Sequence, residues 1–151
     1  MNKIYMVSIV FLTLINLVKA QESDINWLIG RWQIDQAELT SMNFDMYNFH
    51  KDGTFVFAPN AYNGLNRIIE IKGIYLLQGD TILLTPKFIK EVFGGYPVRS
   101  EITTLSDTWE IIEGKIKQVR CKKIITQKAF IHYNPNEKAL QLDNYKYYKI
   151  E

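Results

Sequence analysis

Apolar and polar positions alternate over short runs along most of the chain, and the runs are rich in aromatic and β-branched residues. Glycine, asparagine, aspartate or proline interrupts them at short intervals. An alternation of period two between turn residues is typical of half-buried strands. It predicts strands over residues 47–50, 54–57, 67–77, 81–85, 116–126, 129–133, 139–143 and 147–150. Many short strands with brief turns indicate an all-β fold, either a closed antiparallel barrel or a sandwich.

Two hairpins can be assigned from their turn residues. Asp52-Gly53 stands between the runs 47–50 and 54–57, and Gly79-Asp80 stands between 67–77 and 81–85. Aspartate and glycine favour the tight turns that join neighbouring antiparallel strands. Closing the sheet on itself would remove its exposed edges, which favours a barrel.

Two segments depart from the strand pattern. Thr85 followed by Pro86, with Gly94 eight residues further on, has the signals of a helix start and end, so we predict a short helix near 86–93. In the second segment, Ile102, Leu105, Trp109 and Ile112 fit helical spacing, whereas Thr103-Thr104 and the turn at Gly114 favour a strand. That choice stays open.

Residues 1–20 resemble a signal peptide. Lys3 gives a basic start, residues 4–18 are predominantly apolar, and Ala20 is the small residue expected at a cleavage point. We expect cleavage, an exported protein in the periplasm or outside the cell, and a single domain over 21–151. An uncleaved N-terminal anchor is the alternative, although the apolar run is short for a membrane span.

Removal of the leader changes the charge and leaves one thiol. The chain has 18 basic and 16 acidic residues, and the leader contains Lys3 and Lys19 but no acid, so the mature chain is formally neutral. This balance gives no reason to expect nucleic-acid binding. Cys121 is the only cysteine, so an internal disulfide is excluded. We expect its thiol to be a small buried apolar group.

The stretch Trp27-Leu28-Ile29-Gly30-Arg31-Trp32-Gln33 is interpreted as the plug of a barrel end. Ser23 can cap one helical turn, and Gly30 can end it in a left-handed conformation. Trp32 then shares one face of the first strand with Ile34. The turn presents an apolar wedge formed by Ile25, Trp27 and Leu28.

Gly30-Arg31-Trp32, placed after a helical turn at the start of an all-β chain, resembles the Gly-x-Trp motif of the lipocalin superfamily. Asp52-Gly53-Thr54-Phe55 is similar to a hairpin of its small secreted bacterial members. The resemblance implies an up-and-down antiparallel barrel, in which an arginine of a late strand packs across the tryptophan. Arg120 is the candidate for that arginine. The disulfide usual in the family is absent, and so is a clear C-terminal helix.

The resemblance also implies a binding function, for which two hypotheses remain. In the first, the barrel holds a small apolar molecule, and alternation on neighbouring strands gives the candidate lining residues Phe55, Phe57, Ile69, Ile71, Tyr75, Ile82 and Leu84. A bulge at Lys72-Gly73 would exchange Tyr75 and Leu77 for Ile74 and Leu76. These side chains can equally well fill a compact core. In the second, the barrel binds a partner through its surface, as certain secreted metalloprotease inhibitors do through an N-terminal segment, here 21–26.

Other candidate chemistry is weak. Residues 115–128 carry six positive charges and no acid, and Glu101, Asp107, Glu110 and Glu113 lie just upstream. We expect these segments to pair across strands and favour that arrangement over an anion-binding face. His50, His132 and Cys121 have no metal-ligand spacing, so we expect no metal and no cofactor. Sequence motifs of nucleophilic or phosphate chemistry are absent, so we expect no enzymatic activity, and no stable membrane anchor after cleavage.

Overall fold

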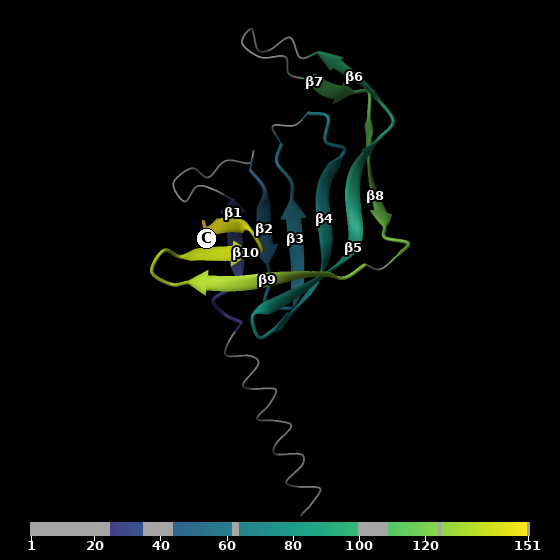
Figure 1. The fold of residues 1–151 in the computed structure, drawn as a ribbon. Coiled ribbons are helices and arrows are strands. Elements are labelled where there is room, and N and C mark those ends of the chain that lie inside the picture. The colour runs from purple at the N-terminus through teal and green to yellow at the C-terminus, as the bar shows by residue number, and fades with distance from the viewer. Residues whose placement is uncertain (1–24, 35–43, 62–63, 100–108, 124, 151) are drawn as a thin grey trace, which may run out of the picture.

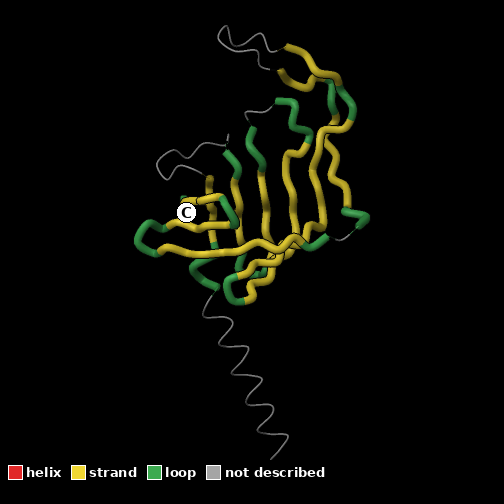
Figure 2. The backbone as a smooth tube through the Cα atoms, in the orientation of Figure 1, coloured by secondary structure: helices red, strands yellow, loops and turns green. Residues whose placement is uncertain are grey.

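The structure is a computed structural model and describes residues 25–34, 44–61, 64–99, 109–123 and 125–150. The predicted signal peptide and residues 21–24 lie outside the described residues. The described residues contain strands and loops but no helix, as Figure 2 shows. They accordingly include no helix of the length and apolarity needed to cross a membrane. The all-β prediction is confirmed.

The described part of the chain contains eleven strands. Their bounds are β1 Gly30–Ile34, β2 Met46–Phe49, β3 Thr54–Ala58, β4 Ile68–Gln78, β5 Thr81–Phe93, β6 Tyr96–Arg99, β7 Trp109–Ile112, β8 Lys115–Arg120, β9 Gln127–Asn134, β10 Ala139–Leu142 and β11 Tyr145–Lys149. Both predicted hairpins are present, as β2–β3 and β4–β5.

Eight of these strands close into an antiparallel up-and-down barrel (Figure 1). Each of β1 to β4 pairs with the next strand in the chain, β5 pairs with β9, and β9, β10 and β11 lead back to β1. Closure therefore depends on two pairings between strands far apart in the sequence, β5 with β9 and β11 with β1. Every strand of the ring has two neighbours, which removes the exposed edges of an open sheet.

The long strand β5 continues past the ring. Its first half, from Thr81 to Leu84, pairs with β9, whereas its second half, from Phe88 to Phe93, pairs with β8. Strands β4, β5 and β8 thus extend one part of the wall, and the β6–β7 hairpin lies at the end of this extension, at the top of Figure 1.

The predicted helix near 86–93 is wrong, because this segment is the second half of β5. Its backbone pairs with β4 on one side and with β8 on the other. Pro86 is accommodated at a register shift between Lys72 and Gly73, and proline is tolerated in sheets at such irregularities. Gly94 ends the strand with a φ of 71°, a conformation that glycine adopts without strain.

The structure also bears on two other predicted segments, residues 116–126 and the segment that contains Trp109 and Ile112. The strand expected over 116–126 is shorter than predicted, because β8 ends at Arg120 and the next strand, β9, begins only at Gln127. Trp109 and Ile112 bound the strand β7, which decides their case in favour of strand. Ile102 and Leu105 lie outside the described residues.

A register shift is present at Lys72-Gly73, but its extra residue is Lys87 of β5, so the alternation of β4 is kept and the exchange of Tyr75 and Leu77 for Ile74 and Leu76 does not occur. Tyr75 is buried and Leu77 packs against the core, whereas Ile74 and Leu76 are exposed. Gly73 is required for packing: a Cβ atom there would meet the Thr85 carbonyl oxygen and lie 2.6 Å from Cε1 of Phe55. The ring of Phe55 therefore lies against the bare backbone of Gly73.

Candidate functional site

One end of the barrel, here called the closed end, is sealed by the stretch that contains both early tryptophans. The Leu28 amide donates a hydrogen bond of 2.9 Å to the Ile25 carbonyl, which closes a single turn before β1. The Trp32 side chain is 0% exposed, and its Nε1 donates to the Leu28 carbonyl oxygen at 2.7 Å. Gly30 joins the turn to β1 with a φ of 122°, which a residue with a side chain adopts only under strain.

Tyr133 and Lys149 complete this plug. The Tyr133 ring stacks on Trp27 at a centroid distance of 5.1 Å and meets Trp32 edge-on at 5.9 Å. Lys149 lies directly across from Trp32 on β11, with Nζ 5.3 Å from the ring centroid. The same ammonium group donates a hydrogen bond of 3.1 Å to the Trp27 carbonyl oxygen, and burial lowers the pKa of Lys149.

The cation over Trp32 is therefore Lys149, not Arg120 as the resemblance to lipocalins implied. Arg120 is exposed on β8, opposite Phe88, in the extension outside the ring. The expectation failed because residues 116–126 were assigned to one strand of the ring. In the structure β8 leaves the ring, and the last strand, β11, supplies the late-strand cation.

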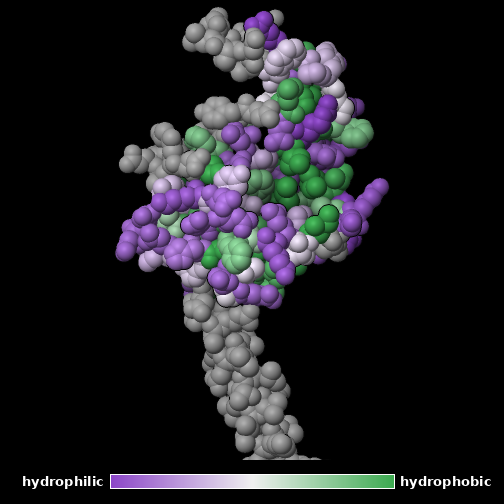
Figure 3. All heavy atoms as spheres, in the orientation of Figure 1, coloured by the Kyte–Doolittle hydropathy of each residue, from purple (hydrophilic) through white to green (hydrophobic). Residues whose placement is uncertain are grey.

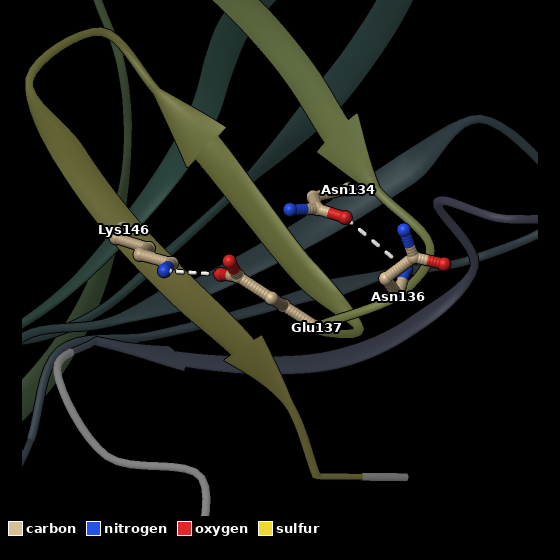
Figure 4. Close-up of polar contacts among 4 residues, drawn as sticks. All are labelled: Asn134, Asn136, Glu137 and Lys146. Carbon is tan, nitrogen blue, oxygen red and sulfur yellow. Dashed lines mark hydrogen bonds and ion pairs between the residues drawn. The ribbon is translucent and has the colours of Figure 1, made fainter.

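The turn from β9 to β10 is fixed by polar contacts, which Figure 4 shows. The Asn134 side-chain oxygen accepts a hydrogen bond of 3.1 Å from the Asn136 amide, and Glu137 forms an ion pair with Lys146 of β11. The carboxylate raises the pKa of Lys146. These contacts lie at the surface and hold the β9–β10 hairpin against β11.

The barrel interior next to the plug is filled by aromatic rings. Tyr47 lies 5.4 Å from Phe49, 4.6 Å from Phe57 and 5.5 Å from Tyr147, measured between ring centroids. Phe49 in turn meets Tyr75 edge-on at 5.2 Å. Ring pairs at these distances are favourable beyond the area they bury. Side chains therefore occupy this part of the interior, as in other small barrels.

A row of directly paired residues leads from the plug across the inner wall, strand by strand, to β8. We call it the inner row, and its members are Trp32, Tyr47, Phe57, Ile71, Ile89 and Val119. Each stands opposite the next on the neighbouring strand, from β1 through β5 to β8. Exposure rises from 0% at Trp32 to 38% at Val119, and the members between them are half-buried. The apolar inner surface thus continues past the closed ring.

Hydrophobic side chains gather over β4, β5 and β8 in the view of Figure 3. On the inner side of the extension, Phe93 lies under the Lys117 ammonium group at 3.9 Å from the ring centroid. Lys117 stands opposite Glu91 on β5. The inner row is therefore flanked, at its exposed end, by charged groups of both signs.

The seven predicted lining residues differ in how deeply they are buried. Phe55, Tyr75, Ile82 and Leu84 are buried members of the core cluster, and Phe57 and Ile71 are half-buried against it. Ile69 is half-buried at a register shift between Ile68 and Glu70, where it has no direct partner on β5. The first four are packed into the core, and Phe57 and Ile71 are members of the inner row.

Two tyrosine hydroxyl groups inside the barrel have altered acidity. Burial raises the pKa of Tyr47 to about 12, and the negative charges of Asp45 and Asp143 add to the effect. Burial also raises the pKa of Tyr75, whose hydroxyl donates a hydrogen bond of 2.8 Å to the His50 carbonyl oxygen. Both phenols are neutral at physiological pH, so the interior gains no charge from them.

Sequence reasoning missed three members of the inner row. Ile89 lies in the segment predicted as a helix, and Val119 lies in the strand predicted over 116–126 but is not among the predicted lining residues. Tyr47 was placed in the β2–β3 hairpin but was not named as an inward residue. The register of that hairpin, which sets Tyr47 opposite Phe57, was a signal that could have identified it.

The basic stretch does not have the partners expected for it. β8 pairs with β5, while β7 pairs with β6, so that Glu110 stands opposite Val98. The Glu113 carboxylate accepts a hydrogen bond from the Tyr96 hydroxyl at 3.1 Å. All six residues of β8 are exposed. Glu101 and Asp107 lie outside the described residues.

Metal-binding groups are scattered. Among the described residues no three His, Cys, Asp or Glu side chains come together as a metal site would require. The Asp52 carboxylate accepts hydrogen bonds from the amide and the hydroxyl of Thr54, which lower the pKa of Asp52. It shapes the β2–β3 turn beside His50. His132 is exposed on the outer side of β9, and Cys121 is half-buried after β8.

No model of a known family matches the sequence, and neither curated proteins nor solved structures show a match to the chain. The barrel itself, with eight antiparallel strands in up-and-down order, is compatible with a lipocalin-like calycin fold.

Proposed function

We propose that this protein is an exported, non-catalytic, lipocalin-like barrel that binds a small apolar molecule at the far end of its inner wall. The single observation that supports the proposal is the inner row, whose apolar members are half-buried at Phe57, Ile71 and Ile89 and exposed at Val119. Ligand sites are mainly apolar and concave, and the inner wall of a barrel provides such a surface.

The location differs from a deep calyx for a physical reason. Rings and aliphatic side chains already pack the half of the interior next to the plug. Displacing these side chains would lose more packing free energy than the binding of a small ligand provides, because cores are close-packed. Phe57 and Ile71 lie half-buried at the border of that packed half, and Ile89 and Val119 continue from them onto β5 and β8. Contact of a ligand with the accessible parts of these side chains adds burial without displacing the core.

The affinity expected from this surface is modest. Burial of about 400 Å² of apolar area, ligand and protein together, contributes about 10 kcal/mol. Association costs at least about 4 kcal/mol, which leaves about 6 kcal/mol. The dissociation constant is then expected to be in the range of tens of micromolar.

The test is titration of a fluorescent fatty-acid or retinoid probe against the wild type and a matched pair of variants. Val119→Asp places a charge at the end of the inner row and should weaken binding at least tenfold. Val56→Asp places the same charge on the outer side of β3, opposite Lys72, and should leave binding unchanged. No saturable binding, or equal affinities for the two variants, would refute the proposal.

The N-terminal segment does not provide a second candidate function. The protease-inhibitor alternative requires residues 21–26 to act outside the barrel. Residues 21–24 lie outside the described residues, and Ile25 begins the turn that carries Trp27 and Leu28 into the plug. No observation on the described residues favours that alternative.

A further inference from the structure

The outer side of β4, β5, β8 and β9 combines exposed apolar side chains with basic ones. Residues that alternate with the buried Tyr75 of β4 and Ala129 of β9 point outward. Beyond the register shift at Lys72-Gly73, Phe88 of β5 stands opposite the outward Lys72, and Arg120 and Ile116 of β8 lie on the same side as Phe88. The exposed apolar side chains on this side include Ile74, Leu76, Phe88, Ile116 and Phe130. Together with the basic residues given below, they are called the outer face.

The basic residues of the outer face stand in the same rows. Phe88 lies between Lys72 of β4 and Arg120 of β8, all three directly paired. Leu83 lies between Leu76 and Lys128 of β9 in the same way.

Lys90 completes the basic set, between Glu70 and Gln118. The carboxylate of Glu70 is bound by Lys72 at 3.1 Å. Among the described residues of the outer face, Glu70 is the one acid against the four cations Lys72, Lys90, Arg120 and Lys128. The face is therefore positive although the chain from residue 21 onward is formally neutral.

Protection of a sheet edge does not account for this composition. β8 is the last strand in the order of the large sheet, and lysines on such a strand discourage pairing with another chain. Protection of an edge strand requires only charged side chains. It gives no reason for Ile116 to be 62% exposed between Lys115 and Lys117, or for the exposed side chains of Ile74 and Leu76.

We propose that the outer face docks reversibly on a bilayer surface that contains anionic lipid headgroups. Basic residues near such a surface are attracted by its negative potential, and scattered apolar side chains enter the boundary between headgroups and acyl chains. Lysine and arginine stems can cover apolar surface while their charges stay among the headgroups. A second copy of this chain is a poor occupant, since two such faces would repel each other.

The bilayer is favoured over an acidic protein by the shape and spacing of the face. The outer side of a barrel wall is convex. Ile74, Leu76 and Leu83 adjoin one another, but Lys72 and Arg120 stand on both sides of Phe88 and Lys128 stands beside Leu83, so cations interrupt the apolar side chains of the outer face. A protein interface normally has a contiguous, well-packed apolar centre. A fluid bilayer needs no such fit.

The experiment is sedimentation of the mature protein with vesicles of phosphatidylcholine alone, and with vesicles in which roughly a third of the lipid is phosphatidylglycerol. We expect binding to the mixed vesicles, weak binding to phosphatidylcholine, and release as salt is raised. Failure to bind the mixed vesicles would overturn the proposal and would leave an acidic protein as the occupant.

Two double variants, one on the outer face and one elsewhere as its control, test whether the outer face is the part that binds. Arg120→Gln with Lys128→Gln should weaken binding about 25-fold, at roughly fivefold per charge. Lys51→Gln with Lys146→Gln removes two charges elsewhere, in the β2–β3 turn and on β11, and should change binding little. An equal loss in both double variants would show a mere effect of net charge and would overturn the proposal.

The apolar part is tested in the same way. Ile116→Thr should reduce binding severalfold, whereas Tyr145→Thr, at a residue of similar exposure (60%) on β11, should not. If Ile116→Thr left vesicle binding unchanged, the proposal that the outer face docks on the bilayer through Ile116 would be overturned. The melting temperature of each variant shows whether it is folded. Binding of the fluorescent apolar probe is measured separately, so a failure of membrane docking can be distinguished from a failure of the proposed binding of an apolar ligand.

Discussion

Removal of the Trp32 side chain tests the plug most directly. Trp32→Ala deletes the largest fully buried side chain and leaves a void among Leu28, Tyr133 and Lys149. Buried Trp-to-Ala changes cost about 3–5 kcal/mol of unfolding free energy. The loss should lie in the upper part of that range, because the Leu28 carbonyl also loses its donor.

Trp32→Phe separates the hydrogen bond from the packing. Phenylalanine keeps most of the ring but has no N–H group, so the Leu28 carbonyl loses its partner, at a cost of about 1–3 kcal/mol. Trp27→Ala removes a half-buried ring and its stacking on Tyr133, and should cost about 1–2 kcal/mol. The expected order of stability is therefore Trp27→Ala, Trp32→Phe, Trp32→Ala, with the last the least stable.

Urea denaturation followed by far-ultraviolet circular dichroism measures these differences without depending on tryptophan fluorescence. Trp109→Ala is the control, since Trp109 is 47% exposed on β7 and should contribute less than about 1 kcal/mol. The reasoning is refuted if Trp32→Ala is within about 1 kcal/mol of the wild type, or if Trp27→Ala is the more damaging change.

The two remaining predictions concern alkaline pH and one glycine. The pKa of Tyr47 is raised in the fold to about 12, so the stability it confers is present below pH 10 and is lost as the pH rises from 10 to 12, by about 2–3 kcal/mol. Tyr47→Phe should flatten that part of a pH titration of stability, and an unchanged slope would contradict the assignment. Gly73→Ala should destabilise by at least about 1–3 kcal/mol through its clash with Phe55 and Thr85. In an ordinary strand the same change stabilises, so a more stable variant would disprove the contact.

Most of the barrel was predictable because its strands follow local rules. The turn residues Asp52-Gly53 and Gly79-Asp80 joined the correct strands, and period-two alternation gave the inward faces of β3 and β4. The segment from Pro86 to Phe93 was not predictable in this way. It is paired on both sides and has apolar residues on both faces, and that pattern has no period of two to distinguish it from a helix.

The candidate site was predictable only in part, for a related reason. Phe57 and Ile71 alternate within strands of clear period, so they were found. Ile89 and Val119 become inner-wall residues only through the pairing of β5 with β8, a contact that depends on where β8 leaves the ring. Lys149 took the place expected for Arg120 for the same reason. Partners of a long strand are set by tertiary structure, which a local pattern does not contain.

The pairing of β1 with β11 has a consequence for how the chain folds. Trp32 and Lys149 are direct neighbours although more than a hundred residues separate them. Contacts between residues this distant in sequence require closure of a long loop, so folding should be slow for a domain of this size. Until that last pairing forms, β1 and β11 present bare edges with unpaired amides, and two partly folded chains can join there. Refolding yield should therefore fall steeply with protein concentration, even though the finished ring has no free edge at this seam.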